Sequence, residues 1–138
     1  MILVTLTLAL GLGSCGATKK LNDAQLYDKT WQLDYISGPR IAFEGLFPDK
    51  KPQITFDRAT GQVSGNAGCN GYRANYTLNG AALSFGAPGP ATLMFCEGGG
   101  EKQFLGMMQK VKAYNIDEAG RLNLLYDGIP MLRFVPMN

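Results

Sequence analysis

Short segments in which apolar and polar residues alternate recur along this chain, and turn-forming residues separate them. Trp31, Leu33 and Tyr35 alternate with polar residues, and the same period of two recurs in residues 54–56 and 72–78. Successive side chains of a β-strand point to opposite faces, so the pattern predicts strands with one buried face. The chain also has 18 glycines among 138 residues, many of them beside Asn, Asp or Pro, where tight turns need them. These features predict a mainly β domain.

Two further patterns define the expected topology. Asn79 and Gly80 separate two alternating segments, which predicts a β-hairpin with a type I′ turn. Residues 101–112 are the only helical candidate, because their apolar residues recur at spacings of three and four. Residues 41–51 are expected to form a long loop or a short irregular strand over one end of the core. The predicted fold is therefore α+β but mainly β: an antiparallel β-sandwich or an open, barrel-like meander with one packed helix.

The first sixteen residues form an apolar run that ends in small residues and a cysteine. An apolar stretch of about eleven residues is too short to span a bilayer, which needs roughly twenty, so the run is interpreted as an export signal. Leu12, Gly13, Ser14 and Cys15 together resemble the lipobox of bacterial lipoproteins. In that family the cysteine is lipidated and becomes the first residue of the mature chain.

The lipobox resemblance implies three segments: a lipoprotein signal peptide at residues 1–14, a lipid-anchored tether at 15–29 and a domain at 30–138. No Lys or Arg precedes the apolar run, so either the true start lies upstream or the signal is weak. An ordinary cleaved signal peptide and a buried strand are the alternatives. We expect the anchor at Cys15 to hold the protein on the outer membrane of a bacterium, facing the periplasm.

Composition excludes several classes of function. The chain has no histidine, which removes the commonest general base and the commonest zinc ligand, and with them serine–histidine and cysteine–histidine hydrolysis. Its 13 Lys and Arg residues balance 11 Asp and Glu residues without a basic block, so nucleic acid is not an expected partner. No catalytic residues, metal-ligand set or cofactor motif stand out, and we expect a protein that is not an enzyme and needs no cofactor.

Cys69 and Cys96 remain once Cys15 is assigned to the anchor. An even pair of cysteines in an oxidising compartment predicts a disulfide. Such a bridge would close a loop of about 28 residues and stabilise the fold by roughly 3.5 kcal/mol on the chain-entropy model. Two buried free thiols are the alternative.

Several short motifs occur in a recognisable order. They are Trp31, then Gly68, Cys69 and Asn70, then Tyr76, then Thr92, Met94 and Cys96, and finally Glu101 with Phe104. In this order and spacing they resemble the META domain, also called the HslJ-like family, from about residue 30 to 135. The resemblance implies a small β-rich domain with one helix, often found on bacterial envelope lipoproteins. It implies no established enzymatic activity and only loose links to stress tolerance or secretion.

The glycine-rich bend at residues 65–70 has two interpretations. In the structural one, the glycines let the backbone pass close to neighbouring strands, and the amides of Asn66 and Asn70 tie the bend to nearby carbonyls. In the functional one, the bend belongs to a recognition site around a glycine-lined concavity. The candidate binding residues of that site are Asn66, Asn70, Tyr72, Arg73 and Thr92.

The function expected from the sequence is a binding or structural role in the envelope, with an envelope protein as partner and the membrane reached through Cys15. We expect the domain to be a monomer. One alternative is an envelope enzyme whose Asp or Glu residues act on cell-wall or glycan substrates, for which a pocket would hold two carboxylates about 5–10 Å apart. Another is a small inhibitor of hydrolases built on the disulfide-pinned scaffold.

Overall fold

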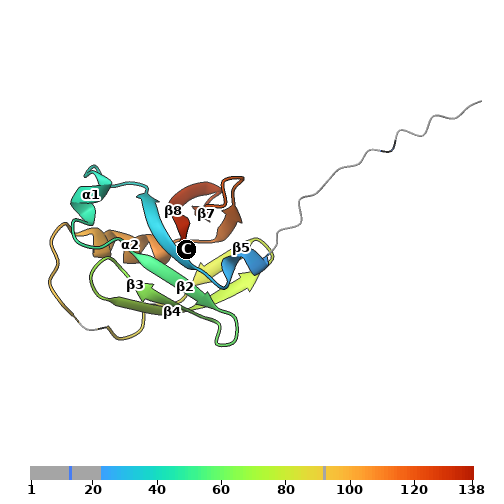
Figure 1. Cartoon of the computed structure of the whole chain (residues 1–138), viewed down its shortest axis with the longest axis horizontal. Coiled ribbons are helices and arrows are strands. Elements are labelled where there is room, and N and C mark those ends of the chain that lie inside the picture. The colour runs from blue at the N-terminus through green and yellow to red at the C-terminus, as the bar shows by residue number, and fades with distance from the viewer. Residues whose placement is uncertain (1–12, 14–22, 92) are drawn as a thin grey trace, which may run out of the picture.

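Eight antiparallel strands follow one another around a closed barrel, each paired with its neighbours in sequence (Figure 1). The computed structural model describes residue 13 and residues 23–91 and 93–138. The strands are β1 (Thr30–Ile36), β2 (Gln53–Asp57), β3 (Gln62–Asn66), β4 (Gly71–Asn79), β5 (Ala82–Phe85), β6 (Ala113–Ile116), β7 (Leu122–Tyr126) and β8 (Ile129–Met137). The barrel closes where β1 pairs with β8, from Thr30 opposite Met137 to Ile36 opposite Leu132. The predicted barrel-like antiparallel meander is confirmed, and it is closed rather than open, which leaves no long strand edge unpaired.

One main helix, α2 (Gly100–Met108), packs on the barrel, as the helical spacing predicted. Phe104 is fully buried, and its ring meets the rings of Tyr72 and Phe134 at centroid distances of 5.7 and 6.4 Å. The helix ends four residues earlier than expected from the pattern. A turn after Met108 carries the buried Val111 into the core, so the apolar spacing continues past the end of the helix.

The packed domain begins before Thr30, because residues 23–29 lie against the barrel instead of forming part of a tether. A short 3₁₀ helix, η1 (Asp23–Leu26), places Leu26 in the core with no exposed surface. The indole N–H of Trp31 donates a hydrogen bond to the carbonyl of Leu26 at 3.0 Å. A single helical turn is too short to produce a recognisable period, so the sequence pattern did not reveal it. The same holds for α1 (Phe43–Leu46), a one-turn helix within the predicted loop.

The two tight hairpin turns are of different types. The predicted hairpin joins β4 to β5, but Asn79 is the last residue of β4 and pairs with Ala82, so the central residues of the turn are Gly80 and Ala81. Of these two, only Gly80 has a positive φ, of 60°. The predicted type I′ turn requires positive φ at both central residues, so that prediction is wrong in detail. Asp127 and Gly128, between β7 and β8, have φ values of 49° and 74° and match the type I′ pattern.

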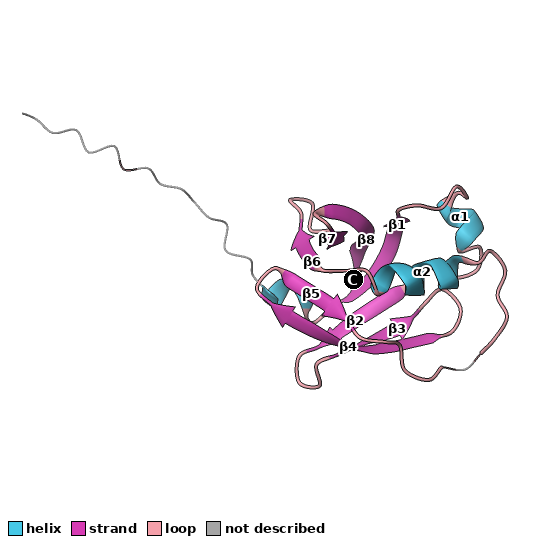
Figure 2. Cartoon of the chain, turned by 180° about the vertical axis from the view of Figure 1, so that it is seen from behind, coloured by secondary structure: helices cyan, strands magenta, loops and turns pink. Residues whose placement is uncertain are grey.

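The two ends of the barrel carry different elements. The short helix α1, the start of α2 and the loop at residues 86–99 lie at one end, and η1 lies at the other (Figures 1 and 2). Inward-facing apolar side chains from all the strands fill the space between the ends in one cluster. The end with α1, α2 and the 86–99 loop, which we call the loop end, also contains the motif residues Cys69, Asn70, Met94, Cys96 and Glu101. Trp31 and Tyr76 instead contact residues near η1: Trp31 bonds the carbonyl of Leu26, and Tyr76 bonds the hydroxyl of Tyr27 at 3.0 Å.

Candidate functional site

Asn70 connects three separate segments at the loop end. Its side chain is almost completely buried, with 3% of its surface exposed. Its amide nitrogen donates to the carbonyl of Met94 at 3.1 Å, and its amide oxygen accepts from the backbone N–H of Met94 at 2.7 Å. The same amide nitrogen donates to Glu101 Oε2 at 2.8 Å, and the backbone N–H of Asn70 donates to Glu101 Oε1 at 3.0 Å. We call these three residues the Asn70 clamp.

The position of Glu101 suits its part in the clamp. It lies in the first turn of α2, where the unpaired backbone N–H groups favour a negative charge. Its carboxylate reaches back to the bend between β3 and β4, so both of its oxygens accept hydrogen bonds from Asn70. The carboxylate is therefore used in holding the helix to the bend.

A disulfide lies beside the clamp. Cys69 and Cys96 are bridged, with their Cα atoms 6.0 Å apart and a separation of 27 positions in the chain. The expected bridge is thus present in the structure, and the alternative of two free thiols is not. Cys69 immediately precedes Asn70, and Cys96 lies two residues after Met94, so disulfide and clamp fix the same stretch of the loop.

The ring of Phe47 explains why glycine stands at two positions of the loop end. A Cβ atom at Gly68 would lie 2.7 Å from the Phe47 ring, and one at Gly100 would lie 2.5 Å from it. Gly68 also has a φ of 99°, which side chains disfavour. The ring thus packs between the bend and the start of α2. Gly98 and Gly100 also lie against the carbonyl of Leu46 in α1, where a Cβ atom at either position would clash.

The loop held by the clamp exposes large apolar side chains. Leu93 and Phe95 have 92% and 93% of their surface exposed, and Met94 between them has 59%. Folded proteins rarely present such side chains together without a function. Sequence reasoning missed this site, because loop residues have no periodic pattern that separates an exposed apolar side chain from a buried one.

The candidate binding residues from the sequence are not gathered into one exposed site. Asn66 uses its side-chain oxygen to accept a hydrogen bond from the N–H of Gly68 at 2.9 Å, within the bend. Tyr72 points into the core, where burial raises the pKa of its hydroxyl, and no residue in the described ranges bonds that hydroxyl. Thr92 lies outside the described residues. Among the described candidates, Arg73 alone is exposed, so these residues do not together present hydrogen-bonding groups around one concavity.

A shallow concavity of about 680 Å³ does lie beside Arg73 on the outside of the barrel. It is lined by the two sides of the bend and by the loop, through Ser64, Gly65, Gly71, Tyr72, Arg73, Gly89, Pro90 and Ala91. The concavity is partly lined by glycines, as the functional interpretation proposed. The segment that precedes Leu93 forms one of its sides.

Two carboxylates border another concavity, at the opposite end of the barrel. Asp28 and Asp57 both line a space of about 770 Å³ near η1. The carboxylate of Asp57 accepts hydrogen bonds from the backbone N–H groups of Ala59 and Thr60 at 2.9 and 3.3 Å. Asp57 therefore caps the turn between β2 and β3, as Asp residues commonly do in turns.

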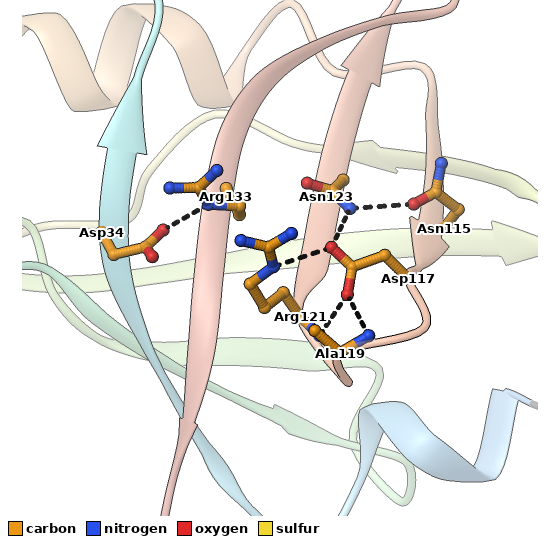
Figure 3. A network of polar contacts seen from close by, with 7 residues as sticks. All are labelled: Asp34, Asn115, Asp117, Ala119, Arg121, Asn123 and Arg133. Carbon is orange, nitrogen blue, oxygen red and sulfur yellow. Dashed lines mark hydrogen bonds and ion pairs between the residues drawn. The ribbon is translucent and has the colours of Figure 1, made fainter.

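A polar cluster covers the outer face of β1, β6, β7 and β8 (Figure 3). Arg133 donates to Asp34 at 2.9 Å, and Arg121 donates to Asp117 at 2.8 Å. Asn123 lies between the strands and donates to Asn115 at 3.0 Å. The bond from Arg133 to Asp34 joins β8 to β1, and the bond from Asn123 to Asn115 joins β7 to β6.

The environment of Asp117 lowers the pKa of its carboxyl group. Burial acts to raise the pKa, but hydrogen bonds from the backbone and side chain of Arg121 and from Asn123 outweigh it. The carboxylate therefore stays ionised at neutral pH, as the ion pair with Arg121 requires.

The part of the chain that the structure describes has neither a cluster of metal ligands nor a membrane-spanning helix. Within it, no group of three or more His, Cys, Asp or Glu residues is placed to hold a metal ion. No helix in that part is long and apolar enough to cross a bilayer. Cys15 and the predicted signal peptide lie outside the described residues, apart from Gly13.

Barrel, clamp and disulfide define a small, closed β-barrel domain whose main helix, α2, begins at the loop end. The chain belongs to the META domain family, whose model matches residues 24–137. It is also similar to a protein from Burkholderia xenovorans solved by NMR, with 24% sequence identity and a TM-score of 0.65. That similarity covers 100% of this chain and 99% of the other, and it shows a shared fold. No curated protein matches the chain.

Proposed function

We propose that this chain is a non-enzymatic domain of the bacterial envelope that binds a protein partner through Leu93–Phe95. The observation that carries the proposal is the exposure of Leu93 and Phe95, 92% and 93%, on a loop whose backbone the disulfide and the Asn70 clamp hold. A loop fixed before binding loses less conformational entropy when a partner orders it. The motif residues Asn70, Met94 and Glu101 support the proposal, because their hydrogen bonds are used in holding the loop. A contribution to stress tolerance rests on the family resemblance alone.

The proposed location is the outer membrane, with the domain facing the periplasm and a lipid anchor at Cys15. The lipobox-like residues 12–15 support the anchor, and a disulfide suits an oxidising compartment. The domain begins at η1, at the end of the barrel opposite the loop (Figure 2). An anchor that precedes η1 would leave the loop free to face away from the membrane that holds it.

The intact mass of the protein extracted from native membranes tests the anchor and the compartment together. We expect a chain that begins at Cys15, carries a diacylglycerol, and gains alkyl groups at Cys69 and Cys96 only after reduction. An unlipidated chain that retains residues 1–14 and has free thiols at all three cysteines, Cys15, Cys69 and Cys96, would rule out the envelope assignment.

A small hydrolase inhibitor is the second candidate function. The observation that favours it is the position of the disulfide, one residue from the exposed Phe95, because a partner enzyme could then meet a loop of fixed shape. Screening the purified domain against periplasmic and secreted hydrolases tests this candidate, with Phe95→Ala as the variant expected to lose inhibition. The enzyme alternative has less support, because Asp57, one of the two carboxylates at the opposite concavity, caps a turn.

A further inference from the structure

Leu93–Phe95 has free backbone groups as well as exposed side chains. Asn70 bonds both the N–H and the C=O of Met94, at 2.7 and 3.1 Å. No residue in the described ranges bonds the backbone N–H or C=O of Leu93 or Phe95. Residues 93–96 form no helix, turn or bend, and the N–H and C=O of Met94 both point toward Asn70, as they do in an extended chain. This stretch therefore offers a partner both hydrogen-bonding groups and apolar surface.

The amide of Asn70 acts toward Met94 as a neighbouring strand would. In an extended chain, successive residues direct their N–H and C=O groups to opposite sides. Since the groups of Met94 face Asn70, those of Leu93 and Phe95 face away from the barrel. The side chains of Leu93 and Phe95, two positions apart, lie on one face of the segment. The arrangement is that of a strand with one paired edge and one open edge.

The hold on the segment comes from both sides. Cys96 is tied to Cys69 directly after Phe95. Before Leu93, the N–H of Gly89 donates to the carbonyl of Arg73 at 2.8 Å, and the N–H of Gly86 donates to the carbonyl of Asn75 at 2.8 Å. The loop thus runs beside β4 before it reaches the open edge, and its position is set by the barrel.

We propose that Leu93–Phe95 docks as an added β-strand against a strand edge of a different protein, with Leu93 and Phe95 in apolar pockets on one side of that edge. Strand addition uses backbone hydrogen bonds for affinity and alternate side chains for specificity. This inference rests on the proposed function and assigns its mode of binding. A lipid surface fits the segment less well, because hydrocarbon cannot satisfy the open N–H and C=O groups.

Site-specific photo-crosslinking in cells tests the docking mode in the full-length protein. The probe is p-benzoylphenylalanine in place of Leu93, with the same probe in place of Ile129, an apolar residue that is 60% exposed elsewhere, as the positional control. Two variants are then compared with the Leu93 probe present. Phe95→Pro removes one outward N–H but tolerates an extended chain, and Phe95→Leu keeps the N–H and an apolar side chain.

The expected result is one protein adduct from the Leu93 probe and none from the Ile129 probe. The yield should fall roughly tenfold in Phe95→Pro, the loss expected for one hydrogen-bond donor, and stay near wild type in Phe95→Leu. Equal melting temperatures of the two variants show that both fold.

Other outcomes overturn the inference, and they separate it from the proposed function. Equal yields in Phe95→Pro and Phe95→Leu exclude strand pairing but leave partner binding intact. An adduct with lipid or with a second copy of this chain excludes a different protein as the occupant of the loop. If a probe elsewhere, such as at Arg73, gives protein adducts and the Leu93 probe gives none, the partner binds at another site. If no probe gives a protein adduct, the proposed function is contradicted as well.

Discussion

The carboxylate of Glu101 accepts two hydrogen bonds from Asn70, one from its backbone at 3.0 Å and one from its side-chain amide at 2.8 Å. The two residues are 31 positions apart, and the bonds join the first turn of α2 to the bend between β3 and β4. The same amide pairs with both backbone groups of Met94. One buried side chain thus holds the helix, the bend and the exposed loop in a fixed arrangement.

Removing the clamp should destabilise the domain strongly. Asn70→Ala removes three part-buried hydrogen bonds, two to the backbone of Met94 and one to Glu101 Oε2, and we expect a loss of about 3 kcal/mol in the free energy of unfolding. Urea unfolding followed by circular dichroism measures it. Asn75→Ala is the control, because Asn75 is exposed and its side chain makes one weaker contact, 3.3 Å from Gln62. Equal losses in the two variants would show that the clamp adds nothing to stability.

The disulfide should stabilise the barrel without being needed for its fold. The double variant Cys69→Ser, Cys96→Ser should keep the β-rich circular dichroism spectrum but unfold more easily. The expected loss is up to about 3.5 kcal/mol, because the bridge restricts a long loop of the unfolded chain. Thermal unfolding of the wild type with and without reductant is the companion measurement. The same melting temperature in both conditions would count against a stabilising bridge.

Substitution of Cys15 should affect membrane attachment and leave stability unchanged. Cys15→Ser removes the only thiol available for the proposed lipid anchor, so the protein should leave the membrane fraction while its melting temperature stays the same. Cys69→Ser is the matched cysteine control, which should lower the melting temperature and keep the protein in the membrane fraction. Fractionation and calorimetry together measure both effects, and retention of Cys15→Ser in membranes would argue against lipidation.

Gly68 should tolerate alanine much less well than Gly61. Both have positive φ, 99° and 67°, but an added Cβ at Gly61 would meet nothing within 4 Å, whereas at Gly68 it would meet the Phe47 ring at 2.7 Å. We expect Gly61→Ala to cost about 1 kcal/mol of stability from backbone strain, and Gly68→Ala about 3 kcal/mol from strain and overpacking. Urea unfolding of the two variants compares the costs; similar values would remove the role assigned to Phe47.

The ionised carboxylate of Asp117 should stabilise the domain at neutral pH, and this contribution should be lost in acid. Burial raises the pKa of its carboxyl, but hydrogen bonds from Arg121 and Asn123 lower the pKa by more than burial raises it. The pKa in the folded state therefore lies below that in the unfolded state. The stability that this carboxylate contributes is present above the unfolded pKa, near 4, and is lost as the pH falls through the folded pKa.

Asp117→Asn should therefore narrow the difference in unfolding free energy between pH 7 and about pH 3. Urea unfolding at the two pH values measures this difference. Glu118→Gln, an exposed neighbour, is the control and should keep the wild-type difference. If Asp117→Asn and the wild type lose the same stability in acid, another carboxyl group is responsible.

Sequence patterns predicted the regular elements of this domain well because those patterns are local. The alternation at Ile54 and Phe56, and that in β4, placed the strands close to their observed bounds. Helical spacing likewise predicted α2, although the predicted helix ended four residues after the observed last residue, Met108. Short helices escaped detection, since the single turns η1 and α1 contain too few residues to show a period.

The candidate site was harder to predict, because the type of a side chain does not determine which residues it contacts in the folded protein. Asn70 and Tyr72 looked like surface hydrogen-bonding groups beside a glycine-rich bend, yet both are buried. Glu101, expected to lie at a helix start, does so, but its partner is a residue of the bend and not of the helix. The aperiodic residues around Leu93 gave no signal of their exposure.

By itself, the sequence determined the order of strands and one helix, a pair of cysteines and a membership in the META domain family. Each of these follows from spacing within a short stretch or from the order of motifs. Closure of the barrel required the tertiary structure, because β1 and β8 pair across about 100 residues that no local pattern connects. The tertiary structure also decided which polar groups became buried partners and which apolar side chains stayed in solvent, since both depend on contacts between distant segments.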